Sequence, residues 1–186
     1  MHVRHVRGLL NVFLLGMSVV TPLLILMAAP VIAAPAPINV VAIGASNTSG
    51  WGVHLQDAYP ARLQAMLRAR GYNVRVRSAG VILDTTAGML RRIDTAVPNG
   101  TRVVILQPGG NDLRFFGTSE RRAANIDAIV TRLRSRKIKV IVFDPVIPPQ
   151  YYQWDGIHIS AKGHAMFASA LLPQVIAAIQ AAPELY

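Results

Sequence analysis

After residue 37 the chain alternates between short apolar runs and longer segments that carry apolar residues at helical spacing. Four runs are rich in β-branched residues and are bounded by Gly, Pro, Asn or Asp, a pattern typical of β-strands. They cover residues 38–43, 73–77, 102–106 and 138–143. Strands that alternate with helices predict an α/β domain in which a mostly parallel sheet lies between two layers of helices, a three-layer α/β/α arrangement.

The segments between the runs indicate amphipathic helices. One predicted helix ends before Gly71, a second covers residues 89–97, and a third begins after Thr118. A last helix is predicted from Ser160 toward Gln180, bent or interrupted at Pro173.

Residues 1–36 have a different pattern, with a basic start, an apolar run over 8–29 and a closing stretch of small residues. This layout is typical of a secretory signal peptide cleaved after Ala33 or Ala34, although the apolar run is also long enough for a membrane anchor. We therefore divide the chain into a signal peptide or N-terminal anchor and a folded domain over residues 37–186. We expect the domain to be periplasmic or secreted, or membrane-anchored if the segment is not cleaved.

The charge of the chain is strongly positive, because 19 Lys and Arg stand against 9 Asp and Glu, a formal net charge of +10. Solvated helix faces account for such a balance, and the alternative is attraction to an anionic membrane or cell-envelope surface. Nucleic acid is not expected as a partner, because an exported domain without a nucleic-acid-binding motif has no means of recognising it.

The sequence contains no cysteine, which excludes a disulfide framework, a thiolate metal site and a cysteine nucleophile. No P-loop or dinucleotide-binding glycine motif occurs. His54 and His164 have no carboxylates at metal-ligand spacing, and we expect both at the surface or in loops. We therefore expect neither a metal nor a cofactor.

Polar residues that suit nucleophilic catalysis follow the predicted strands or precede the last helix. Ser46 follows the first strand, Asn111 follows the third, and Asp155 and His158 come just before the last helix. Each has an ordinary structural interpretation as a turn or loop residue. Together they indicate a site, because parallel strands bring their carboxyl ends to one edge of the sheet. There an Asp can orient a His, the His can activate a Ser, and an Asn amide can donate to an oxyanion.

Three segments resemble conserved blocks of a known family, the SGNH (GDSL-type) hydrolases, most closely its bacterial thioesterase I/lysophospholipase branch. The segments are Gly44-Ala45-Ser46, Gly109-Gly110-Asn111-Asp112 and Asp155-Gly156-Ile157-His158. The resemblance covers nearly all of the chain after Pro37 and implies a flavodoxin-like fold with four to five strands. It implies Ser46 as nucleophile, His158 as base and acid, Asp155 as its orienting partner, and Asn111 with the Ser46 N–H as oxyanion donors.

The chain departs from this family at three places. Ala45 replaces the acidic residue that usually precedes the serine, and Leu83 stands where the family has an oxyanion-hole glycine. Leu83 keeps a backbone N–H, so we retain it as a candidate oxyanion donor. The stretch from Asp144 to Asp155 is too short for the usual additional helix and fifth strand, which favours a four-stranded sheet.

The resemblance implies an exported serine esterase that hydrolyses carboxylic esters or thioesters, with a small molecule or a lipid as substrate. Aromatic residues near the predicted catalytic loops are either substrate contacts or loop anchors; the candidates are Phe115, Phe116 and Tyr152. The alternatives are a carbohydrate O-acetyl esterase with the same catalytic residues, and a non-catalytic envelope protein that retains the fold.

Overall fold

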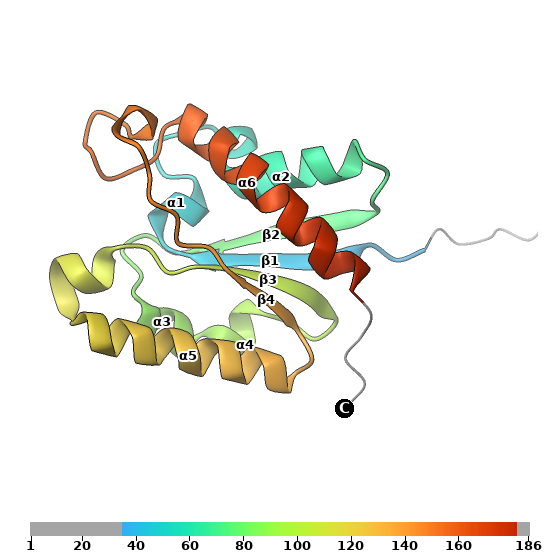
Figure 1. The fold of residues 1–186 in the computed structure, drawn as a ribbon, viewed down its shortest axis with the longest axis horizontal. Coiled ribbons are helices and arrows are strands. Elements are labelled where there is room, and N and C mark those ends of the chain that lie inside the picture. Colours follow the sequence, from blue (N-terminus) through green and yellow to red (C-terminus); the bar gives the residue numbers. More distant parts are fainter. Residues whose placement is uncertain (1–34, 182–186) are drawn as a thin grey trace, which may run out of the picture. The chain divides into compact units, whose positions relative to one another are not determined.

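The computed structural model describes residues 35–181, apart from the side chain of Phe116. Its centre is a parallel sheet of four strands in the order β2-β1-β3-β4 (Figure 1). The strands are β1 (Ile38–Gly44), β2 (Val74–Gly80), β3 (Thr101–Gln107) and β4 (Lys139–Val142). Helices lie on both faces of the sheet, so the predicted three-layer α/β/α fold is confirmed, with the smaller of the two expected strand numbers.

Six helices flank the sheet in the described part of the chain. They are α1 (Ser46–Ser49), α2 (Tyr59–Arg68), α3 (Thr86–Arg91), α4 (Ile93–Ala96), α5 (Ser119–Ser135) and α6 (Ala161–Gln180). Three single turns add to them: η1 (Leu55–Asp57), the π-helical η2 (Asp112–Phe116) and η3 (Pro149–Tyr151). Helices α2 and α6 cover one face of the sheet, and α3, α4 and α5 cover the other (Figure 1).

Alternate residues of each strand point to opposite faces, so the sheet contributes to two separate cores. One core joins Val40 and Ile105 of the sheet to Phe167 of α6. The other joins Val41 and Leu106 to Leu133 of α5. Burial on both faces explains why the central strands β1 and β3 carry continuous apolar runs. The edge strand β2 instead alternates buried Val74 and Val76 with exposed Arg75 and Arg77.

Two predicted helices differ from the observed ones. The segment 89–97 lies in two short helices, because α3 ends at Arg91 and α4 begins at Ile93. The last helix is not interrupted, since α6 continues through Pro173 to Gln180. A proline inside a helix removes one backbone hydrogen bond. The apolar residues of α6 on either side of it are buried in the core, and this packing maintains the helix.

No fifth strand follows β4 in the described residues. The chain instead crosses residues 143–160 as a loop that contains η3 and one isolated antiparallel bridge, between Tyr152 and Ile159. This agrees with the prediction drawn from the short Asp144 to Asp155 stretch. The predicted signal or anchor lies almost wholly outside the described residues, and no helix within residues 35–181 is both long and apolar enough to span a membrane.

Candidate active site

Ser46 lies at the carboxyl end of β1, where it begins the short helix α1. The turn is held by the Ala45 carbonyl oxygen, which accepts hydrogen bonds from the N–H groups of Thr48 and Ser49, each at 3.0 Å. The turn packs tightly on Gly80 of β2. A Cβ atom at position 80 would lie only 2.2 Å from the Ser49 nitrogen, too close for any side chain. Glycine is required at position 80 for this approach, which leaves Ser46 nearly buried, with 9% of its surface exposed.

Asp155 and His158 form a tightly bonded pair. Asp155 Oδ2 lies 2.5 Å from His158 Nδ1, and Asp155 Oδ1 accepts the backbone N–H groups of Ile157 and His158 at 2.9 Å. The hydrogen bond to the His158 ring and these two backbone bonds lower the pKa of Asp155 to about 2. The carboxylate therefore stays ionised and fixes the ring through Nδ1, which leaves Nε2 for proton transfer.

The loop that carries this pair is attached to the turn that carries Ser46. Asn47 Oδ1 accepts a hydrogen bond from the Ile159 N–H at 3.0 Å, and the ring centroids of Trp51 and His158 are 6.0 Å apart. Gln153 Nε2 donates to the carbonyl oxygens of both Trp51 and Ile159, each at 2.9 Å. Ser46 Oγ itself makes no hydrogen bond to any described residue, so the bond between nucleophile and base is not formed in this structure.

Asn111 lies at the carboxyl end of the neighbouring strand β3 and is also nearly buried. Its Nδ2 donates to the Asp84 carbonyl oxygen at 2.9 Å. A side-chain amide has two N–H donors, so this bond orients the group and leaves one donor for a ligand. Ser46 and Asn111 line the same cavity of about 280 Å³.

The three predicted substrate contacts differ in position. Tyr152 lines the cavity with Ser46. Phe115 does not line it; the residue is 54% exposed, and its ring centroid lies 5.9 Å from the Arg114 guanidinium carbon. The Phe116 side chain lies outside the described part. From the same segment it is Leu113 and Arg114 that line the cavity.

Leu83 also lies away from the cavity lining, with 64% of its surface exposed. Its φ of 61° is in the left-handed region that favours glycine. Its N–H has no hydrogen-bond partner within residues 35–181. Leu83 therefore has the backbone conformation of a glycine position although it is not a glycine. Its role as oxyanion donor stays a prediction.

Comparisons with known proteins identify the family of the chain. The model of the GDSL-like Lipase/Acylhydrolase family matches residues 42–170. The chain belongs to this family. Membership confirms the resemblance read from the three sequence blocks.

The individual relatives of this family member have low sequence identity to it. Esterase TesA of Pseudomonas aeruginosa is 28% identical over 115 residues, which are 61% of this chain but only 57% of that protein. A crystal structure of TesA superposes with a TM-score of 0.69 at 20% identity, covering 75% of this chain and 99% of that one. AlinE4, an SGNH-hydrolase family esterase, superposes with a TM-score of 0.59 at 26% identity, covering 80% and 100%. The TesA structure supports the fold alone.

Two residues of this GDSL-like hydrolase that sequence reasoning missed shape the site. Asp112 is buried, and its carboxylate accepts the Thr86 N–H at 2.9 Å and the Thr86 hydroxyl at 2.5 Å. This ties the Asn111 loop to the start of α3.

Arg122 lines the cavity and donates to the Gly109 carbonyl oxygen and to Asp144 Oδ2. The only sequence signal for Asp112 is its position next to Asn111. No sequence signal distinguishes Arg122 from an arginine on a solvated helix face.

The expectation that His164 lies at the surface or in a loop is wrong. His164 is fully buried in α6, and its Nδ1 accepts the Tyr59 N–H at 3.1 Å. Burial, with a smaller contribution from the Arg62 charge, lowers the pKa of His164 to about 4. The ring is therefore a neutral core side chain that joins α6 to α2. Among residues 35–181, no three His, Asp or Glu side chains gather as they would around a metal ion.

Proposed function

We propose that the chain is a serine esterase that cleaves carboxylic esters or thioesters through an acyl-enzyme at Ser46. The observation that carries this proposal is the Asp155–His158 pair, held by the Asn47–Ile159 hydrogen bond beside the turn that bears Ser46. An ionised Asp bonded to a His ring, next to a serine at the carboxyl edge of a parallel sheet, is the arrangement that acyl transfer needs.

In the proposed mechanism His158 Nε2 takes the proton from Ser46 Oγ as Oγ attacks the carbonyl carbon of the ester. Asn111 Nδ2 and the Ser46 N–H donate to the oxyanion that forms. His158 then gives its proton to the leaving alcohol or thiol, which departs and leaves an acyl group on Oγ. Water attacks this acyl-enzyme with His158 again as base, and Asp155 stabilises the imidazolium in both halves.

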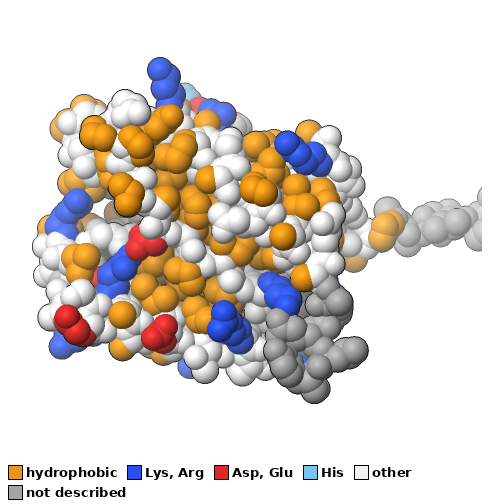
Figure 2. Space-filling model, in the orientation of Figure 1, with side chains coloured by type: hydrophobic (Ala, Val, Ile, Leu, Met, Phe, Trp, Pro, Cys, Tyr) orange, Lys and Arg blue, Asp and Glu red, His pale blue; other side chains and the backbone are white. Residues whose placement is uncertain are grey.

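Exposed apolar residues on the loops at this edge of the sheet support an acyl-chain substrate. Ten of the eleven large hydrophobic side chains that are exposed in the described part lie on segments that follow the strands at this edge. They are Trp51, Leu55, Val81, Ile82, Leu83, Leu113, Phe115, Val146, Trp154 and Ile157. Val146 and Trp154, each 96% exposed, belong to the loop after β4. Figure 2 shows hydrophobic side chains gathered on the face that it draws. A lipid-like ester suits these apolar loops better than an acetylated sugar does.

We also propose that residues 1–36 export the domain, on the basis of their basic start, apolar run and small-residue end. The net charge of +10 would favour an anionic membrane surface as the place where a lipid ester is met.

Labelling of the full chain with a fluorophosphonate probe tests the catalytic site, because the probe reacts with a serine only when its base is in place. We expect the parent protein to be labelled and Ser46→Ala to be unlabelled and inactive. Ser135→Ala, at the far end of α5, serves as control and should be labelled like the parent. Labelling of Ser46→Ala would contradict the nucleophile, and an unlabelled parent would favour the non-catalytic alternative.

A series of p-nitrophenyl esters of increasing chain length tests the substrate class. We expect kcat/KM to rise from acetate to medium-chain esters. A preference for acetate, together with deacetylation of an acetylated oligosaccharide, would favour the carbohydrate O-acetyl esterase instead.

A further inference from the structure

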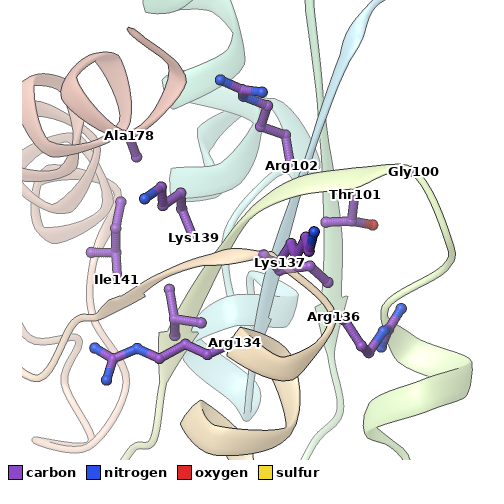
Figure 3. Close-up of a pocket in the computed structure, with 11 residues that line it drawn as sticks. Gly100, Thr101, Arg102, Arg134, Arg136, Lys137, Lys139, Ile141 and Ala178 are labelled. Atoms are coloured by element: carbon purple, nitrogen blue, oxygen red, sulfur yellow. The ribbon is translucent and has the colours of Figure 1, made fainter. Parts of the chain in front are cut away.

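A second cavity, of about 440 Å³, lies at the opposite end of the sheet from Ser46, where β3 and β4 begin. Five basic residues line it, and no carboxylate is among its lining residues in the described part. The basic residues are Arg102, Arg134, Arg136, Lys137 and Lys139 (Figure 3). They come from β3, from the end of α5 and from β4, so three elements bring positive charge to one place.

Three of these charges, on Arg102, Arg134 and Lys137, have no carboxylate partner among the described residues. Arg102 Nη2 donates to the carbonyl oxygens of Ile179 and Ala181, at 3.2 and 2.7 Å, which fixes the guanidinium without cancelling its charge. Arg134 and Lys137 make no side-chain hydrogen bond or ion pair with any residue in 35–181. Figure 2 shows Lys and Arg side chains on the face where α5 ends and β4 begins.

The carboxylate that pairs with Arg136 is already shared with a second arginine. Asp94 pairs with Arg132, and its Oδ1 lies 3.6 Å from Arg136 Nη1. Arg136 also donates to the Val97 carbonyl oxygen at 2.5 Å, which turns its guanidinium toward α4. Positive charge on Arg102, Arg134 and Lys137 that no described carboxylate neutralises attracts anions.

The backbone at Lys137 adds an independent observation. Its φ is 58°, in the left-handed region where glycine usually ends a helix. The Lys137 N–H donates to the Arg134 carbonyl oxygen at 2.8 Å, so the residue closes α5 in this strained conformation. A lysine here is unfavourable for the fold and places an ammonium group at the cavity. A strained residue that the fold does not need is a sign of function.

We propose that this cavity binds a phosphate-bearing anion, apart from the ester site. Phosphate oxygens accept charge-assisted hydrogen bonds from Arg and Lys, and Arg134 and Lys137 are the two cations with that capacity unused. Apolar lining residues Ile138, Val140 and Ile141 would contact an organic part of the ligand. Free pyrophosphate and a phospholipid headgroup share this chemistry.

Calorimetric titration of the full chain with pyrophosphate, in a phosphate-free buffer, tests the proposal together with vesicle co-sedimentation. The pocket variant is Arg134→Ala with Lys137→Gly. The control is Arg75→Ala with Arg121→Ala, two exposed arginines without side-chain partners in the described part, so both variants lose two charges. We expect the pocket variant to bind at least about tenfold more weakly, the loss of one charge-assisted hydrogen bond or more, and the control to stay within about twofold of the parent.

The two sources of phosphate are separated by the two assays. Pocket-dependent binding of pyrophosphate points to a free phosphate compound. Pocket-dependent binding to phosphatidylglycerol vesicles, but not to phosphatidylcholine vesicles or pyrophosphate, points to an anionic headgroup. Equal losses in the pocket variant and the control, or no binding in either assay, would overturn the proposal.

Lys137→Gly alone adds a second readout, because it removes backbone strain and charge at once. We expect this variant to have a higher Tm than the parent without ligand and a weaker affinity for the anion. A higher Tm with unchanged affinity for both phosphate sources would remove Lys137 from the site and overturn the role given to its strain.

Discussion

Asn47 Oδ1 accepts a hydrogen bond from the Ile159 N–H at 3.0 Å, across 112 residues of sequence. Asn47 follows Ser46 and Ile159 follows His158, so one bond fixes the distance between the loops of the proposed nucleophile and base. Ile159 is fully buried and is bridged to Tyr152, which makes it a firm anchor.

Asn47→Ala should therefore lower kcat by about 10- to 100-fold, because a displacement of about 1 Å between reacting groups has effects of this size. KM should change little. Asn47→Asp keeps an oxygen acceptor at the same place and should recover most of the activity. The rate of fluorophosphonate labelling should fall in parallel with kcat, and an unchanged labelling rate in Asn47→Ala would show that the bond does not position the base.

Asp155→Asn should lower kcat by a factor of roughly 10²–10⁴, because an amide neither holds the imidazole in the productive tautomer nor stabilises the imidazolium. The low pKa of Asp155, about 2, means that the parent carboxylate is charged at every pH where the enzyme is assayed. Steady-state kinetics between pH 6 and 9 measure the effect. A change below about threefold would make the Asp155–His158 pair a structural one.

Asn111→Ala should lower kcat by about 10²–10³ with little change in KM, the size expected for the loss of one oxyanion donor. Asn125→Ala is a matched control, because its amide donates to Thr86 Oγ1 at 3.0 Å and does not line the cavity. Its kcat should stay within about threefold of the parent. If Asn111→Ala raises KM and leaves kcat unchanged, Asn111 contacts the substrate rather than the oxyanion.

The parts of the structure that depend on local sequence were predictable. The central strands β1 and β3 were recognisable as continuous apolar runs because they are buried on both faces of the sheet. Ser46 and Asn111 were found because they follow strands whose carboxyl ends meet at one edge, and Asp155 and His158 because they stand as a polar pair just before the last helix. The four-stranded sheet followed from the length of one loop.

The parts that depend on contacts distant in sequence were not predictable. Arg122 and Asp144 are 22 residues apart, and only the fold turns this arginine toward the cavity. His164 is buried because α6 crosses α2, a contact that spans 105 residues. The continuation of α6 through Pro173 reflects the burial of its apolar side, which outweighs the lost hydrogen bond.

The pKa of His164, about 4 in the folded chain against 6.5 ordinarily, predicts a pH-dependent stability. Between these values the unfolded chain binds a proton that the folded chain does not, so stability falls as pH drops from about 6.5 to 4. The loss is on the order of 3 kcal/mol at about 1.4 kcal/mol per pH unit.

His164→Asn keeps an acceptor for the Tyr59 N–H but cannot titrate. Thermal melts from pH 8 to 4 should show a smaller decline for this variant than for the parent. Asp57 and Arg62, the charged groups near the ring, are unchanged in it. Parallel declines in the two proteins would show that His164 does not carry the effect.

Leu83→Gly should stabilise the protein and change kcat by less than about tenfold. Leucine at a φ of 61° costs about 1–2 kcal/mol relative to glycine, partly offset by the greater freedom of glycine in the unfolded chain, so Tm should rise by a few degrees. The backbone N–H is present in both residues, and Asp84, whose carboxylate accepts from the Arg92 Nε at 2.8 Å, holds the loop in either case.

Lys137→Gly relieves the same strain far from Ser46 and serves as the control, with a similar gain in Tm and no change in kcat. A hundredfold gain in kcat for Leu83→Gly would mean that the leucine turns its N–H away from the oxyanion, since about 10²–10³ in rate is the effect of one aligned donor. The natural chain would then be a hydrolase that works with an incomplete oxyanion hole.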